Sequence, residues 1–326
     1  MSTPLKQPTP TKKIKQRIRI IFMGTPEFSL PSLAALAAAK DFEIIGIFTQ
    51  PDKPIGRKQA ITPPPVKQLA VKNGWPVFQP EKIKTEIENI KNLQPNLIVV
   101  TAYGKIIPQT ILDLPTYGCI NVHASLLPKY RGAACLNAPI LNGDPETGVT
   151  IMKMESGLDT GPILRQAKIQ LKGKETLEEV HDRLASLGAE LLVPTLRDFI
   201  EQKIVPQPQD EARASYVKTL NKEDGRIDWS KPAEEVARLI RAFNPWPGAY
   251  SLLKNGKIVK IISAESLDSN FPANYRGTLQ FANNQLVIPC GRGALIILKL
   301  QLGGGRVLQT KEFLRGHQDL INQQLK

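Results

Sequence analysis

The stretch IRIIFMGTPEFSLPSLAALAAA, residues 18–39, decides the fold class. Its first six residues are apolar except for one arginine, which is typical of a strand covered on both faces of a parallel sheet. The residues from 29 onward predict a helix, because a proline is tolerated in a first helical turn. The alternation continues through predicted strands at 43–49, 97–101, 119–123 and 149–154 and helices at 66–73 and from Thr176 to about residue 200. This order predicts an α/β fold, with a doubly wound, Rossmann-like N-terminal domain built on a parallel-rich sheet.

The pattern changes after residue 204. Residues 205–222 are polar, contain prolines and show no periodicity, which indicates a linker. A predicted helix at 233–242 is followed by short strands at 257–263, 277–281, 285–289 and 294–302. Short strands at this spacing predict a small C-terminal β-barrel of OB-like type. The expected organisation is a basic flexible tail at 1–17, a first domain at 18–204, the linker, and a second domain at 223–326.

Composition limits the kind of protein. The 326 residues suffice for about two domains, and 41% hydrophobic with 22% charged residues is ordinary for folded domains. No apolar run approaches the roughly 18 residues of a membrane helix, so no membrane partner is expected. The three cysteines, Cys119, Cys135 and Cys290, are widely spaced and form no CxxC pair. They argue against a disulfide scaffold or a cysteine-based zinc site and for a reducing compartment, the cytoplasm.

The net charge of +13 is concentrated at the two ends of the chain. Residues 1–20 carry +6, residues 21–200 only +1, and residues 201–326 again +6; residues 241–326 by themselves carry +7. A basic region beside a nearly neutral domain favours a polyanionic partner, nucleic acid first, although solubility alone also accounts for a net charge.

Polar residues stand at three predicted strand ends, where open α/β sheets place their sites. The sequence MGTPEF at 23–28 has one glycine, and the chain has no GxGxxG or GxxxxGK pattern, so neither a dinucleotide nor a nucleoside triphosphate loop is predicted. Asn121 and His123 end the strand CINVH and share one face of it, because side chains alternate along a strand. Asp159 lies in the glycine-bounded loop SGLDTG. Taken singly, Asn121 could be a turn residue, His123 a structural histidine and Asp159 a loop cap. Together at predicted strand ends, the three residues favour a functional site.

Seven segments carry a resemblance that covers nearly the whole chain from residue 18: IFMGTPEFSLPSL (21–33), TQPDKPIGR (49–57), INVHASLLPKYRGAA (120–134), GDPETGVTIM (143–152), SGLDTGPIL (156–164), KEDGRIDWS (222–230) and RAFNPWPGAY (241–250). The pattern N-x-H-x-S-L-L-P followed by G-L-D-T-G resembles the folate-dependent formyltransferases. The C-terminal segments with FNPWPGAY narrow the resemblance to the methionyl-tRNA formyltransferase family. After RGAA that family usually has proline, and Cys135 stands there instead. This departure puts the local loop packing in doubt, not the chemistry.

The resemblance implies an enzyme that moves a formyl group from 10-formyltetrahydrofolate, as co-substrate, to the amino group of methionine on initiator tRNA. The implied catalytic residues are Asn121, His123 and Asp159. An uncharged amide such as Asn121 suits the developing oxyanion, and His123 can relay a proton near neutral pH. The carboxylate of Asp159 favours the charged imidazole and orders a water. The reaction requires neither a metal nor a covalent enzyme intermediate.

The resemblance also implies two binding regions. The folate-contacting residues are expected to be Ser125, Leu126, Leu127 and Pro128, with Tyr103 and Ile106 as weaker candidates. The loop at 51–65 is long and basic at its centre, as loops with a function often are. The expected tRNA contacts are Arg57 and Lys58 in this loop and Lys254, Lys257, Lys260 and Arg306 in the C-terminal domain. We expect a monomer whose first domain is catalytic and whose barrel binds initiator methionyl-tRNA.

Two other classes of function stay open at this point. An amino-sugar formyltransferase or a formyltetrahydrofolate hydrolase would share the N-x-H core and its aspartate. A non-catalytic tRNA-binding module would keep the basic barrel alone. Formate release without tRNA would indicate the hydrolase, and tRNA binding without turnover would indicate the module.

Overall fold

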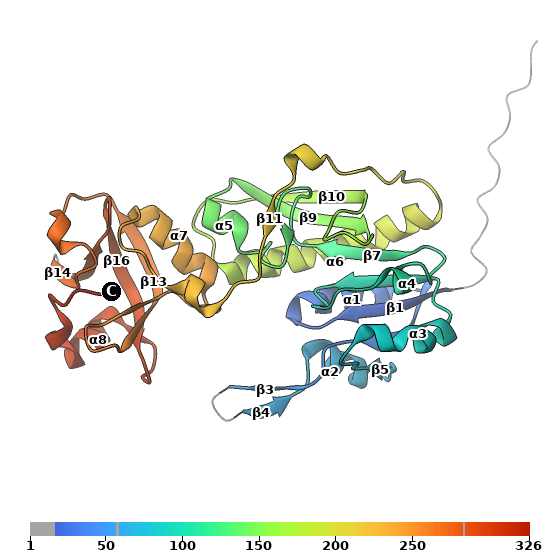
Figure 1. Ribbon diagram of the computed structural model, residues 1–326, viewed down its shortest axis with the longest axis horizontal. Helices are drawn as coiled ribbons and strands as arrows, with labels where there is room; N and C mark the ends of the chain where they lie inside the picture. Colours follow the sequence, from blue (N-terminus) through green and yellow to red (C-terminus); the bar gives the residue numbers. More distant parts are fainter. Residues whose placement is uncertain (1–16, 57–58, 283) are drawn as a thin grey trace, which may run out of the picture. The chain divides into compact units, whose positions relative to one another are not determined.

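The computed structural model describes residues 17–56, 59–282 and 284–326 (Figure 1). Its largest element is a seven-stranded sheet with the order β10-β9-β7-β6-β1-β2-β5. These strands are β1 (Ile18–Gly24), β2 (Phe42–Phe48), β5 (Val77–Phe78), β6 (Leu97–Thr101), β7 (Cys119–His123), β9 (Glu146–Lys153) and β10 (Ile163–Gln170). The pairings of β1 with β2 and β6, of β2 with β5, and of β6 with β7 are parallel. The predicted α/β fold with a parallel-rich sheet is confirmed.

Helices connect the strands along the chain: α1 (Leu30–Ala38), α2 (Pro65–Lys72), α3 (Ile87–Leu93), α4 (Gln109–Leu112), α5 (Ala138–Asn142) and α6 (Leu177–Ile200). The long helix α6 begins with a capping box. The Thr176 N–H donates to the Glu179 carboxylate at 2.8 Å, and the Glu179 N–H donates to Thr176 Oγ1 at 3.3 Å. In the described part of the chain, none of the helices is both long and apolar enough to cross a bilayer.

Contacts divide the described chain into two compact units. Unit 1 holds the residues up to 122 together with 151–156 and 189–206, and unit 2 holds residues 123–150, 157–188 and 207–326. Unit 1 has an apolar core to which β1, β2, β6 and α3 contribute buried side chains, among them Ile21, Phe48, Ile90 and Ile98. The sequence pattern placed the domain boundaries at residues 204 and 223, and these boundaries stay predictions.

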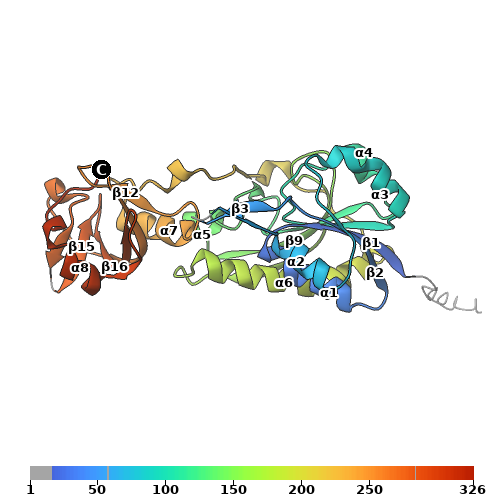
Figure 2. The same cartoon turned by 90° about the horizontal axis from the view of Figure 1, so that it is seen from below.

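The C-terminal part of unit 2 is a six-stranded antiparallel sheet, seen with its helices in Figure 2. Its strands are β12 (Tyr250–Leu252), β13 (Ile258–Leu267), β14 (Gln280–Ala282), β15 (Gln285–Pro289), β16 (Ala294–Leu302) and β17 (Leu308–Gln309). Helix α7 (Ala233–Phe243) and helix α8 (Thr310–Gly316) contribute buried side chains to the same core. The last residues of the chain form backbone hydrogen bonds near both edges of the sheet. Lys326 exchanges two with Leu252 on β12, and the Leu325 N–H donates to the carbonyl of Gly277, just before β14, at 2.8 Å. The predicted second domain of short strands is confirmed.

Two segments carry more structure than the sequence pattern indicated. Within the predicted loop at 51–65, β3 (Lys53–Ile55) pairs antiparallel with β4 (Ala60–Thr62), and Gly56 with a φ of +73° lies in the connecting turn. Within the predicted linker, β11 (Tyr216–Val217) pairs in parallel with β8 (Arg131–Gly132). Both pairings involve only two or three residues per strand, too few to produce a periodic signal.

Candidate active site

Strand β7 carries the first two predicted site residues. His123 is its last residue and is only 6% exposed, and Asn121, two positions earlier, is partly buried. Because side chains alternate along a strand, both point to the same face of the sheet, as the sequence predicted.

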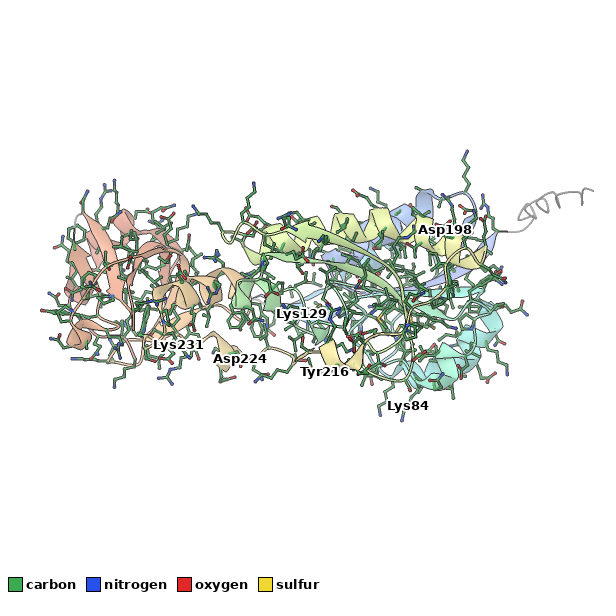
Figure 3. The ribbon with its side chains drawn as sticks, turned by 90° about the horizontal axis from the view of Figure 1, so that it is seen from above. Lys84, Lys129, Asp198, Tyr216, Asp224 and Lys231 are labelled. Atoms are coloured by element: carbon green, nitrogen blue, oxygen red, sulfur yellow. The ribbon has the colours of Figure 1, made fainter. Side chains whose placement is uncertain are left out.

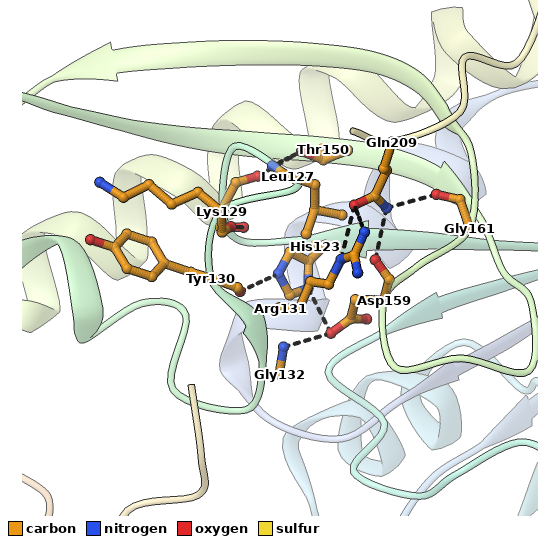
Figure 4. A network of polar contacts seen from close by, with 11 residues as sticks. His123, Leu127, Lys129, Tyr130, Arg131, Gly132, Thr150, Asp159, Gly161 and Gln209 are labelled. Carbon is orange, nitrogen blue, oxygen red and sulfur yellow. Dashed lines mark hydrogen bonds and ion pairs between the residues drawn. The ribbon is translucent and has the colours of Figure 1, made fainter. Parts of the chain in front are cut away.

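The imidazole of His123 has two different environments (Figure 4). Nε2 lies 3.0 Å from the carbonyl oxygen of Tyr130, and since a carbonyl only accepts, Nε2 carries the proton. Nδ1 lies 3.7 Å from Asp159 Oδ2, in a pair whose side chains are 6% and 16% exposed. Nδ1 is therefore the ring nitrogen that carries no proton in this tautomer, and it faces a carboxylate.

Asp159 is held at both its main chain and its side chain. Its φ of +53° is unusual for a residue with a Cβ. Oδ2 accepts the Gly132 N–H at 2.8 Å, while the Gln209 amide donates to the Asp159 carbonyl and to the Gly161 carbonyl, each at 2.7 Å. The structure thus brings His123 and Asp159 together, with Asn121 on the same strand as His123.

A buried arginine, Arg131, is linked to Asp159 through Gln209. The Arg131 side chain is 0% exposed, and its five N–H groups make five hydrogen bonds. Gln209 Oε1 accepts two, the Glu211 carboxylate two, and the Tyr216 hydroxyl one; Tyr216, on β11, is labelled in Figure 3. Hydrogen bonds to Glu211 raise the pKa of Arg131, and those to Arg131 lower the pKa of Glu211. Sequence reasoning missed Arg131 and Gln209, although Arg131 stood inside the quoted segment INVHASLLPKYRGAA.

The predicted folate segment is fixed within unit 2. Ser125 is fully buried and donates to the Lys129 carbonyl at 2.6 Å. Thr150 Oγ1 donates to Ser125 O and accepts the Leu127 N–H, at 2.6 and 3.1 Å. Leu127 is buried, whereas Leu126 and Pro128 keep part of their surface exposed.

The two weaker folate candidates differ in access. Tyr103 is 2% exposed in the core of unit 1, and burial raises its pKa to about 12. Ile106 is 89% exposed. Of the two, only Ile106 offers its side chain to a ligand from solution.

The predicted tRNA contacts divide into two groups. Arg57 and Lys58 lie outside the described residues. Lys254, Lys257, Lys260 and Arg306, which we call the C-terminal cation group, lie near one end of β13. The loop with Arg306 is bonded to that end, since the Gly303 N–H donates to Ile258 O at 2.7 Å. Lys254, Lys257 and Arg306 are exposed, Lys260 is half-buried, and Arg306 forms an ion pair with Glu312 at 3.3 Å.

Cys135 is a buried neutral thiol. Burial raises its pKa to about 12, and the nearby charge of Asp159 acts in the same direction. All three cysteines are free and buried. No cluster of three metal-ligating side chains occurs among residues 17–56, 59–282 and 284–326.

Comparisons with known proteins agree with this fold. Residues 16–196 match the family model "Formyl transferase", and residues 219–318 match "Formyl transferase, C-terminal domain". A methionyl-tRNA formyltransferase of Caldanaerobacter subterraneus subsp. tengcongensis is 45% identical over 303 residues, covering 92% of this chain and 97% of that protein. That of Clostridium novyi is 41% identical over 312 residues, covering 95% and 100%.

Solved structures show the same fold at low identity. HypX from Aquifex aeolicus, in complex with tetrahydrofolic acid, matches with a TM-score of 0.61 at 17% identity, over 92% of this chain and 47% of that one. An N-formyltransferase from Helicobacter canadensis, with folinic acid and dTDP-3-aminofucose, matches with a TM-score of 0.63 at 19% identity, over 86% and 99%. With two family models and relatives that are more than 40% identical over nine-tenths of its length, this chain belongs to the methionyl-tRNA formyltransferase family.

Proposed function

We propose that this chain transfers the formyl group of 10-formyltetrahydrofolate to the α-amino group of methionine on initiator tRNA. The observation that carries the proposal is that His123, buried at the end of β7 and on the same strand as Asn121, lies 3.7 Å from the carboxylate of Asp159 in the loop 156–161. The names of its relatives, methionyl-tRNA formyltransferases at 41–45% identity, supply the substrate class.

His123 serves as the proton relay. Its Nε2 is committed to Tyr130, so the ring cannot turn without losing that hydrogen bond, and Nδ1 is left for the reaction. The 3.7 Å between Nδ1 and Asp159 Oδ2 is longer than a hydrogen bond, so Nδ1 can also engage a water or the substrate. Asp159 stabilises the imidazolium whenever Nδ1 holds a proton.

The reaction then balances with one relayed proton. A bond forms between the methionine nitrogen and the formyl carbon, and the bond from that carbon to the folate nitrogen breaks. The proton lost by the attacking amine passes through His123 to the departing nitrogen. The Asn121 amide donates to the formyl oxygen as it gains negative charge.

The segment after β7 suits the folate co-substrate. Leu126 and Pro128 present partly exposed apolar surface on a backbone that Thr150 and Ser125 hold in place. A rigid apolar edge of this kind fits a flat heteroaromatic ring, because little conformational entropy is lost on binding.

The C-terminal cation group suits the phosphates of a tRNA. Three of its four members are exposed, so they can replace counterions along an RNA backbone. We further propose that the protein acts as a monomer in the cytoplasm, a reducing compartment in keeping with its three free cysteines.

Formyl transfer to methionyl-tRNA tests the proposal, with initiator and elongator tRNAs assayed side by side and formate release measured without tRNA. We expect transfer to depend on methionyl-tRNA, with His123→Ala lowering kcat about 100-fold or more and Asn121→Ala about 100- to 1,000-fold. More than half of wild-type turnover in His123→Ala, with folate binding unchanged, would remove His123 from the mechanism. Formate release independent of tRNA would indicate a hydrolase, and tRNA binding without turnover a binding module.

A further inference from the structure

The peptide groups on either side of Arg131 form hydrogen bonds with His123 and Asp159, two members of the proposed site. On one side, the Tyr130 carbonyl accepts the His123 Nε2–H at 3.0 Å. On the other side, the Gly132 N–H donates to Asp159 Oδ2 at 2.8 Å. A distortion of residues 130–132 therefore acts on the positions of both His123 and Asp159.

These three residues are in turn fixed by the segment 207–217. The Arg131 N–H donates to Ser215 O at 2.8 Å, and the Tyr130 N–H donates to Ser215 Oγ at 2.9 Å. Strands β8 and β11 continue this contact, pairing Tyr216 with Arg131. A guanidinium out of contact with water must have its N–H groups satisfied, and the segment supplies acceptors for all five.

Gln209 connects this arginine to the loop of Asp159. Its Oε1 accepts from Arg131 Nε and Nη2 at 3.1 and 2.9 Å, and its Nε2 donates to Asp159 O and Gly161 O at 2.7 Å each (Figure 4). Arginine can only donate and carbonyls can only accept, so the amide has one possible orientation. One side chain thus links the buried guanidinium to the main chain of the Asp159 loop.

We propose that Gln209, oriented by Arg131, is a positioning residue that holds the Asp159 carboxylate against His123, so that the segment 207–217 is part of the active site. The inference rests on the proposed function, in which Asp159 acts through His123. Asp159 has a backbone conformation that L-residues rarely adopt, and two donations from Gln209 keep it there. Without them the loop relaxes and its carboxylate moves away from Nδ1.

The variant Gln209→Glu separates this role from a purely structural one. A glutamate still accepts from Arg131, so the buried charge keeps its partner, but it cannot donate to the two carbonyls. We expect kcat to fall about 10- to 100-fold, the cost of a misplacement near 1 Å, with KM for both substrates within about twofold. The control is Gln323→Glu, which also removes an amide donation to a carbonyl, Asp319 O at 3.0 Å, and should leave kcat and KM unchanged.

A double-mutant cycle shows whether the effect passes through Asp159. In the Asp159→Ala background, Gln209→Glu should lower kcat by less than about twofold, because nothing remains to be positioned. Wild-type kcat in Gln209→Glu, or a full additional loss in the double variant, would overturn the proposal. If the wild-type protein transferred no formyl group, the proposed function would fail, and the positioning role would be judged by the next measurement.

That measurement needs no activity. The chain has only three histidines, so imidazole ¹H–¹⁵N spectra resolve His123 from His181 and His317. Gln209→Glu should change the chemical shifts of the His123 ring and leave those of the other two histidines unchanged. His123 signals identical to those of the wild type would overturn the positioning role.

Discussion

Replacing Gly132 by alanine should separate β8 from β11 and disable the site. Gly132 has a φ of +105°, and a Cβ added there would lie 2.3 Å from the Val217 carbonyl oxygen. Ordinary van der Waals contact begins at 3.4 Å, so the two backbones must move apart by about 1 Å. The same N–H that would move now donates to Asp159 Oδ2 at 2.8 Å.

The size of the effect follows from these distances. A shift of about 1 Å takes the bond to the Asp159 carboxylate beyond hydrogen-bond range, and a misplacement of that size costs about 100-fold in turnover. The unfavourable φ alone costs about 1–3 kcal/mol. Since about 1 kcal/mol lowers the melting temperature of a domain of this size by roughly 2–4 °C, a loss of several degrees is expected.

Steady-state formyl transfer and thermal unfolding of the full chain measure both effects. The matched control is Gly173→Ala, because Gly173 also has a positive φ, +79°, but a Cβ added there would meet no neighbouring atom within 4 Å. The control variant should have a lower melting temperature and an unchanged turnover number. Wild-type kcat in Gly132→Ala would refute the idea that the β8–β11 contact sets the position of Asp159.

Three further predictions concern other parts of the molecule. Hydrogen bonds from Arg197 lower the pKa of Asp41. This pair therefore stabilises the fold above about pH 4, and its contribution is lost as the pH falls through the lowered pKa. In thermal unfolding, Asp41→Asn should lower the free energy of unfolding by about 0.5–1 kcal/mol at neutral pH and leave it unchanged in strong acid. Charge reversal in the C-terminal cation group should reduce the slope of log K for tRNA against log salt by roughly 0.7–0.9 per lost phosphate contact, and an unchanged slope in filter binding would exclude the group. Burial raises the pKa of each of the three cysteines to about 12, so iodoacetamide at about pH 8 should label few thiols in the native protein and all three after denaturation; rapid native labelling would contradict their burial.

Local sequence signals were sufficient where one residue pattern determines an element. The apolar run at 97–101 and the strand pattern at 119–123 give β6 and β7 with their observed bounds, and the pair of Thr176 and Glu179 marks the start of α6. Strand β10 was missed because its sequence ILRQAKIQ alternates between partly buried and exposed residues and lies at the sheet edge. An edge strand lacks the continuous apolar run by which a central strand is found.

The candidate site was predictable only in part, for a related reason. Strand alternation places Asn121 and His123 together, and the glycine-bounded loop indicates Asp159. Nothing local distinguishes Arg131 from a solvated arginine, because its acceptors lie 78–85 residues further along the chain. Burial of a charge is a property of the assembled fold, so Arg131 and Gln209 could be recognised only from the structure.

These contacts also predict where a truncated chain can end without losing the partners of Arg131. A cut after residue 204 would remove Gln209, Glu211 and Tyr216, and with them every acceptor of the Arg131 guanidinium. A cut after Val217 would keep every one of these partners, together with the β8–β11 pairing. Three polar side chains between 207 and 217 accept from the buried guanidinium, and one of them also donates to the loop of Asp159. The composition of this segment therefore resembles that of a linker, while its contacts fix the main chain next to His123 and Asp159.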